Sequence, residues 1–109
     1  MLKKVYRLPA KQKFKNSSFF KTPNFNLRIS KNNLENSRFG FVVRKAVDRR
    51  AVARNRARRV LRSCIEEMIE KINSGHDMLF VLEKGIIGKD REEIFREVKK
   101  LLTEKKLLS

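Results

Sequence analysis

Closely spaced arginines are the chemically distinctive residues of this sequence. The stretch RRAVARNRARRVLRSC carries seven arginines in its first fourteen residues, from Arg49 to Arg62. A guanidinium is planar, stays charged at any physiological pH and binds a phosphate through two parallel hydrogen bonds. Because no acidic residue lies within this stretch, its chemistry is that of polyanion binding rather than catalysis. We therefore expect a partner rich in phosphate.

The same stretch has the apolar spacing of an amphipathic helix over residues 51–73. Its apolar positions are Ala53, Ala57, Val60, Leu61, Cys64, Ile65, Met68 and Ile72. At about 100° per residue, the opposite arc holds a polar set. That set is Asn55, Arg58, Arg59 and Arg62. One side of the helix is thus expected to pack against a core, while the other side presents arginine.

A basic helix face has three interpretations, namely a solvated surface, a membrane-surface helix and a nucleic-acid interface. Cations at the start of a helix oppose its dipole, and here no acidic residue stands at i,i+4 to offset them, which indicates neutralisation by a partner. The apolar side has no Trp, Phe or Tyr and is needed as core, which disfavours the membrane. Arginine suits structured RNA or DNA, so we favour a nucleic-acid partner over the two alternatives.

The overall composition agrees with this interpretation. The formal net charge of the 109 residues is +16, and residues 1–62 hold 19 Lys and Arg against two acidic residues. Residues 63–109 hold 9 basic and 10 acidic residues, so all of the excess lies in the first part. A charge of this size is retained for a polyanionic partner rather than for folding. The length predicts a single domain over residues 1–109.

Cysteine content and hydropathy restrict the class of protein further. Cys64 is the only cysteine, so neither an intramolecular disulfide nor a cysteine zinc cluster is possible. Its apolar neighbours predict a buried, unreactive thiol. No apolar run has the length of a signal peptide or of a membrane span, so we expect a cytoplasmic protein with no membrane partner.

Alternating apolar residues predict strands on both sides of a turn. Phe25, Leu27 and Ile29 share one face of a strand, and the loop over residues 31–37 is expected to reverse the chain. Phe39, Phe41 and Val43 then share a face of a second strand. The two strands are expected to pair as an antiparallel hairpin.

The second half of the chain predicts one strand and one helix after the arginine-rich helix. Residues 77–83 (DMLFVLE) are continuously apolar apart from their ends, which is typical of a central strand buried on both faces. Asp90 and Glu93 provide a cap for a final helix. Its apolar side is Ile94, Val98, Leu101, Leu102 and Leu108. The expected order is a short helix, two or three strands, a long helix, a strand and a helix.

No set of side chains has the spacing of a catalytic site. His76 adjoins a turn at residues 73–75 and is expected at the surface, and the acidic residues of the later helices have the spacing of solvated faces. Nothing on the basic side pairs His, Asp and Glu for acid–base or metal chemistry. We therefore expect no catalytic residue and no metal ligand in the protein; a protein-only nuclease is the enzymatic alternative.

Residues 40–62 (GFVVRKAVDRRAVARNRARRVLR) resemble the signature region of the bacterial ribonuclease P protein subunits. The Arg54-Asn55-Arg56 motif is similar to the RNR helix of that family, and it likewise follows a strand, a basic Lys45 and a short connection. Residues 6–8 with Phe14, and HDMLFVLEKG followed by a helix, resemble the family's first and last segments. Arg44 and Ala46 depart from the residues that are common at those positions.

The resemblance implies a small α+β domain, an α/β sandwich with a central, mostly antiparallel sheet in the order α-β-β-β-α-β-α. It also implies a left-handed βαβ crossover, which is contrary to the general rule. The implied role is to bind a catalytic RNA and the 5′ leader of precursor tRNA, whose removal uses Mg²⁺ held mainly by the RNA. No obligate protein partner is implied. A ribosomal or other structural RNA-binding protein is the alternative.

The resemblance also assigns residues to two RNA-binding surfaces. The set facing the catalytic RNA is Lys45, Arg49, Arg50, Arg54, Asn55, Arg56, Arg58, Arg59 and Arg62. The set for the precursor leader, which combines aromatic and polar residues, is Phe14, Phe19, Phe20, Asn26 and Arg28. Asn55 either caps or orients the arginines or binds a phosphate, and each of these three phenylalanines is either a stacking platform or part of the core. Four other aromatic residues are assigned to the core, namely Phe25, Phe39, Phe41 and Phe80.

Overall fold

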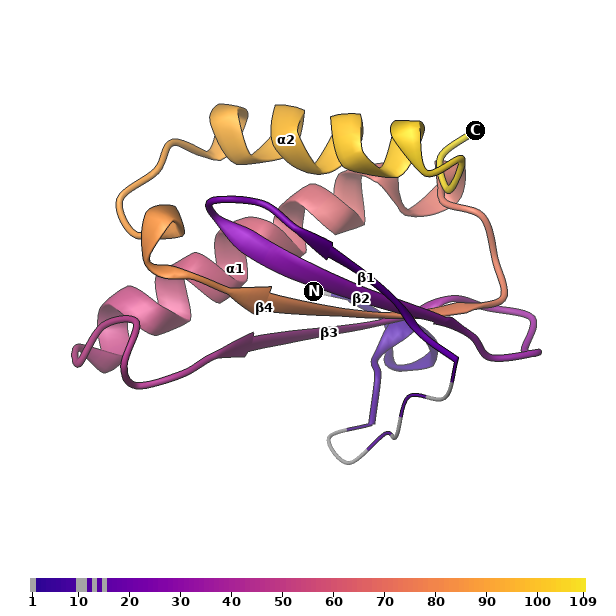
Figure 1. The fold of residues 1–109 in the computed structure, drawn as a ribbon, viewed down its shortest axis with the longest axis horizontal. Helices are drawn as coiled ribbons and strands as arrows, with labels where there is room; N and C mark the ends of the chain where they lie inside the picture. The colour runs from indigo at the N-terminus through magenta and orange to yellow at the C-terminus, as the bar shows by residue number, and fades with distance from the viewer. Residues whose placement is uncertain (1, 10–11, 13, 15) are drawn as a thin grey trace.

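The computed structural model describes residues 2–9, 12, 14 and 16–109, and these form an α+β fold with one four-stranded sheet and two helices (Figure 1). The elements in chain order are η1 (Lys4–Tyr6), β1 (Ser18–Lys21), β2 (Phe25–Lys31), β3 (Arg38–Val43), α1 (Ala51–Met68), η2 (Ile69–Lys71), β4 (His76–Leu82), η3 (Lys84–Ile86) and α2 (Arg91–Glu104). The expected fold class and coarse order are confirmed, and the first short helix is a single 3₁₀ turn.

The strand order is β1-β2-β4-β3, so the predicted hairpin between the second and third strands is wrong. β4 lies between them, antiparallel to β2 and parallel to β3. The loop over residues 31–37 does reverse the chain as expected, but both strands pair with the more apolar β4, which places that strand in the interior of the sheet. Pairing of neighbouring strands is only a tendency, and burial of the most apolar strand outweighs it here.

The connection from β3 through α1 to β4 is a crossover between parallel neighbours. In Figure 1 both strands point to the left, α1 passes behind the sheet, and β4 lies above β3. This arrangement has the left-handed sense, in agreement with the expectation from the resemblance. It places the start of α1 beside the carboxyl end of β3.

Both helices cover the same face of the sheet, and the core lies between the helices and that face (Figure 1). The most deeply buried side chains of the sheet are Phe25, Leu27, Met78, Phe80 and Leu82. Those of the helices are Leu61, Cys64, Ile65, Ile94, Val98 and Leu102. Cys64 is therefore buried as predicted, and burial raises the pKa of its thiol.

Two expectations about burial need correction. β4 is central, but its Leu79 and Val81 are only half-buried, because they point to the face of the sheet that no helix covers. Phe25, Phe39, Phe41 and Phe80 were expected in the core, and all except Phe41 are buried. Phe41 is half-buried and stacks on Phe80 with ring centroids 5.6 Å apart.

The N-terminal segment covers part of the outer face of the sheet, which is the face opposite the helices. The backbone N–H of Leu8 donates to the carbonyl of Phe39 at 3.0 Å, which continues the pairing beyond the β3 edge. A Cβ atom at Gly40 would lie 3.1 Å from the Leu8 side chain, so glycine permits this close contact. The remainder of the outer face, over β1 and β2, stays open to solvent at Phe19 and Arg28.

The ends of the helices differ in detail from the sequence prediction. α1 ends at Met68 and continues as η2, rather than extending to residue 73. Asp90 stands at the N-cap of α2, yet its side chain makes no capping hydrogen bond. Leu108 lies beyond α2 and pairs with Ile72 in an isolated bridge, which ties the chain end to the loop before β4. Within the described residues, no helix is both long and apolar enough to cross a membrane.

Candidate nucleic-acid interface

α1 holds the arginines in a fixed array because its opposite side is packed. Ala57, Leu61 and Cys64 are buried against the sheet and α2, while Arg56 and Arg59 are exposed. Neither of these two arginines has a hydrogen bond or ion pair among the residues that the structure describes. Their charges are therefore available to a partner.

Asn55 orients one of the arginines. Its Oδ1 accepts a hydrogen bond from Nη2 of Arg58, one turn further along the exposed side of α1. The orienting role left open for Asn55 thus has a contact within the protein, and its contact with a phosphate stays a prediction.

Two members of the predicted set use their charge within the protein. Nη1 of Arg54 donates to the carbonyl oxygens of Asp48 at 2.8 Å and Arg49 at 2.9 Å, which fixes the turn before α1. Arg50 pairs with Asp48, with Nε 3.1 Å from Oδ1 and Nη2 2.9 Å from Oδ2. This pair lowers the pKa of Asp48 to about 2. Asp48 is therefore an anion that compensates part of the positive charge at the start of the helix.

The remaining cations of the set frame the same surface. Lys45 and Arg49 are exposed in the connection between β3 and α1. The guanidinium of Arg62 lies 5.9 Å from the centre of the Phe41 ring, so it bridges α1 and β3. Within the part of the chain that the structure describes, six cations of the set have no ion pair and no side-chain bond to the backbone. We call them the RNR surface: Lys45, Arg49, Arg56, Arg58, Arg59 and Arg62.

A hollow beside Arg62 was not predicted from the sequence. It has a volume of about 340 Å³ between α1, β3 and the N-terminal segment. Its lining residues are Leu2, Arg7, Leu8, Phe39, Gly40, Phe41 and Arg62. Arg7 donates from Nε to the carbonyl of Leu2 at 3.1 Å. No local sequence signal marks this hollow, because three segments distant in the chain form it.

The structure brings together three of the five residues assigned to the leader. Phe19, Asn26 and Arg28 lie on the outer face of the sheet, where the Arg28 guanidinium is 5.7 Å from the centre of the Phe19 ring. Phe19 is 49% exposed, which is unusual for a phenylalanine and suits a stacking platform. Asn26 donates to Oε1 of Glu83 at 3.1 Å. We call Phe19, Asn26 and Arg28 the outer-face site.

A fourth residue of that set, Phe20, lies on the other side of the sheet. Phe20 points to the helix-covered side of the sheet, where Nζ of Lys105 is 4.4 Å from the centre of its ring. Strand alternation explains this, since neighbours in β1 must face opposite sides. Phe14 is half-buried in the N-terminal segment.

Basic residues that were not assigned to either RNA-binding surface adjoin the outer-face site. Lys21, Arg44 and Lys84 line a hollow of about 600 Å³ with Asn26 and Glu83. Nη2 of Arg44 lies 3.4 Å from Oε1 of Glu83, and both side chains are partly exposed. Arg44 is one of the two departures from the family pattern, and its charge faces this hollow rather than α1.

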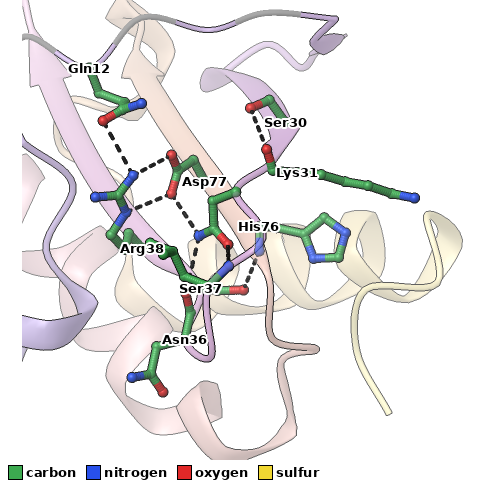
Figure 2. Close-up of polar contacts among 10 residues, drawn as sticks. Gln12, Ser30, Lys31, Asn36, Ser37, Arg38, His76 and Asp77 are labelled. Carbon is green, nitrogen blue, oxygen red and sulfur yellow. Dashed lines mark hydrogen bonds and ion pairs between the residues drawn. The ribbon is translucent and has the colours of Figure 1, made fainter.

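A buried ion pair supports the outer face at the start of β3 and β4 (Figure 2). Arg38 binds both carboxylate oxygens of Asp77, with Nε 2.8 Å from Oδ1 and Nη2 2.7 Å from Oδ2. Asn32 donates to the same carboxylate at 2.9 Å, and Arg38 also donates to Gln12 at 3.2 Å. Asp77 is 2% exposed. Burial opposes its ionisation, but the hydrogen bonds from Arg38 and Asn32 outweigh this effect and hold its pKa below the usual range.

The described residues do not bring three His, Cys, Asp or Glu side chains together where they could hold a metal ion. His76, predicted at the surface, is half-buried, and its Nδ1 is fully buried because the residue opens β4 beside the C-terminal tail.

Comparison with known proteins identifies the family. Residues 2–106 match the family described as Ribonuclease P. A ribonuclease P protein component of Microcystis aeruginosa is 35% identical over 72 residues, which cover 66% of this chain and 60% of that protein. One of Histophilus somni is 34% identical over 80 residues, covering 73% of this chain and 66% of that protein. The matched regions thus span slightly less than two thirds of these relatives' lengths.

Solved structures agree with the fold. The RNase P protein of Thermotoga maritima superposes with a TM-score of 0.80 at 23% identity, covering 90% of this chain and 96% of that one. A mutant of the Staphylococcus aureus RNase P protein, described as defective in mRNA degradation, superposes with a TM-score of 0.84 at 19% identity. The superposition covers 96% of this chain and 92% of that one. The chain belongs to the ribonuclease P protein family, as its RNR helix and mixed sheet indicate.

Proposed function

We propose that this protein is the protein subunit of a ribonuclease P, the ribonucleoprotein endonuclease that removes the 5′ leader of precursor tRNA. The observation that carries this proposal is the RNR surface, in which six cations on and beside one helix have no ion pair with any described residue. A catalytic RNA is the proposed partner of this surface. Its phosphates would replace the compensating acids that the first half of α1 lacks.

The outer-face site is the proposed contact for the leader of precursor tRNA. Phe19 offers an exposed ring for stacking, and Arg28 lies beside it to bind the backbone. Stacking does not require a particular base, which suits leaders of varied sequence. The two surfaces lie on different sides of the sheet, so one protein molecule can bind both RNAs.

The chemistry is proposed to belong to the RNA. The described residues offer neither a metal cluster nor a paired acid and base at either surface, so the protein's part is to bind and to orient. Mg²⁺ is expected to be held mainly by the RNA of the holoenzyme, and it supplies the activated hydroxide and the charge stabilisation for phosphodiester hydrolysis.

Reconstitution tests this proposal. The purified protein is mixed with a bacterial ribonuclease P RNA, precursor tRNA and Mg²⁺, at a salt concentration where the RNA alone cleaves slowly. Adding the protein is expected to increase specific cleavage at the 5′ end of the mature tRNA. Tight binding to ribosomal RNA with no effect on cleavage would support a structural RNA-binding protein instead.

A further inference from the structure

A hollow of about 560 Å³ lies at the end of the sheet, on the helix-covered side and away from both surfaces described above. β1, β2 and β4 form one wall, and the tail after α2 forms the other. The side chains used below are Phe20, Lys31, His76 and Lys105, together with Asn16 and Asn33 from the adjoining loops. The volume falls within the range of sites that hold small molecules.

The charge of the hollow favours an anion. Lys31 and Lys105 line it, and no Asp or Glu is among its described lining residues. The Lys31 ammonium has no hydrogen bond or ion pair within the described part of the chain, and the Lys105 ammonium lies over the face of the Phe20 ring. Two ammonium groups without an acidic neighbour can form charge-assisted hydrogen bonds to a phosphate.

His76 adds an imidazole ring to the lining of the hollow. Its Nδ1 is buried and has no hydrogen-bond partner among the described residues. Figure 2 shows that its imidazole points away from the Arg38–Asp77 pair, so that network does not satisfy it. A water molecule in the hollow does not reach this atom, so a ligand there would contact His76 through the remaining edge of its ring.

The two asparagines add neutral hydrogen-bonding groups. Asn16 and Asn33 have left-handed backbone conformations, with φ of 52° and 57°. Their side-chain amides have no hydrogen bond within the described residues, and each can both donate and accept. Such amides complement the edge of a nucleobase, whereas the lysines complement a phosphate. The hollow therefore combines the groups that bind both ends of a nucleotide.

We propose that this hollow is a nucleotide-binding site. Lys31 and Lys105 bind the phosphate, Phe20 contacts the base, and His76 with one or both asparagines hydrogen-bonds to the edge of the base. The ligand is a 5′-nucleotide, either free or as an unpaired residue of an RNA chain. The site lies on the opposite side of the sheet from Phe19 and Arg28, so it is separate from the proposed leader contact.

Nuclear magnetic resonance titration of the 109-residue protein tests the proposal at about 150 mM salt, where long-range attraction is screened. The probes are 5′-AMP, adenosine and inorganic phosphate, and the signals are those of the His76 ring and the two lysine ammonium groups. We expect 5′-AMP to shift these signals and to bind at least about tenfold more tightly than adenosine or phosphate. Absence of these shifts, or equal affinity for phosphate, would overturn the proposal.

Matched variants test the assigned residues. Lys31→Ala with Lys105→Ala removes two charges from the hollow, and Lys99→Ala with Lys100→Ala removes two exposed charges from α2 outside it. The first pair is expected to weaken 5′-AMP binding about tenfold or more and the control pair less than about twofold. Equal losses in both pairs would show non-specific attraction and refute the site.

His76→Phe separates a binding role from a structural one. The variant keeps a ring but removes both nitrogens, including the buried Nδ1, so its melting temperature is expected to be unchanged or raised. Binding of 5′-AMP is expected to weaken, because the ring can no longer hydrogen-bond to the base. Full binding by this variant would refute the role of His76.

A single-stranded tetranucleotide identifies the source of the ligand. If it shifts the same signals at lower concentration than 5′-AMP, the site takes an unpaired residue of an RNA chain. If 5′-AMP binds at least as tightly, the site takes a free nucleotide.

Discussion

Removing Arg56 and Arg59 together should weaken binding of the catalytic RNA without affecting the fold. Both side chains are exposed on α1 and have no partner within the described residues, and alanine is a strong helix former. The double substitution Arg56→Ala, Arg59→Ala therefore deletes two charges of the RNR surface and nothing that packs.

The size of the effect follows from the six cations of that surface. With about 0.8 counterions released per phosphate contact, six contacts give a slope of about −5 for log affinity against log salt concentration. Between 50 and 200 mM salt the affinity of the unmodified protein should then fall about 800-fold, and that of the double variant with four contacts about 80-fold. The slope itself should become shallower by about 1.4 to 1.8.

The assay is a binding titration of the protein against a ribonuclease P RNA at several salt concentrations. The pair Lys99→Ala, Lys100→Ala on α2 serves as the charge-matched control and should leave the slope nearly unchanged. Circular dichroism should give the same helix content for all three proteins. An unchanged slope in the Arg56, Arg59 variant, or an equal change in the control, would refute the assignment of the RNR surface.

Four further outcomes are expected. Arg28→Ala should leave assembly with the RNA subunit intact but reduce the preference for precursor over mature tRNA, since only the precursor has a leader to contact Phe19 and Arg28; loss of assembly would contradict the outer-face site. Arg38→Met should lower the free energy of unfolding by about 3 kcal/mol in urea titrations. This is the low end of the cost of breaking a buried ion pair, because the Arg38 side chain is 19% exposed. A loss below about 1 kcal/mol would show that the pair is dispensable. The pKa of Asp77 is lowered in the folded protein, so its ionised carboxylate stabilises the fold at pH values above about 3.9, the pKa of an aspartate in the unfolded chain. This stabilisation is lost as the pH falls below that value. The melting temperatures of the unmodified protein and Asp77→Asn should therefore converge as the pH falls through that range. The purified protein alone should not cleave precursor tRNA, and specific cleavage by RNA-free protein would overturn the assignment of the chemistry to the RNA.

The part of the candidate site that lies within one helix, α1, could be predicted from the sequence. The spacing of the arginines on α1 places their exposed face correctly, because helix geometry fixes relative directions within a helix. Sequence alone did not show that Arg54 bonds to the carbonyls before the helix or that Arg50 pairs with Asp48, since local turn geometry decides both contacts. Phe20 was grouped with Phe19, although strand alternation separates them once β1 is known to pair with β2.

The sequence by itself determined the class of the protein and the identity of its elements. Apolar alternation in β2 and helical spacing in α1 are local properties that the chain carries in its own order, and the RNR motif indicated the family. Tertiary structure decided which strands meet. β4 separates β2 from β3, because burying the most apolar strand between two neighbours stabilises the sheet more than a short hairpin between β2 and β3 would. The apolar pattern within one strand does not show which other strand it will pair with. The same long-range pairing brings His76 beside Lys31 and the C-terminal tail, so the nucleotide hollow exists only in the folded chain.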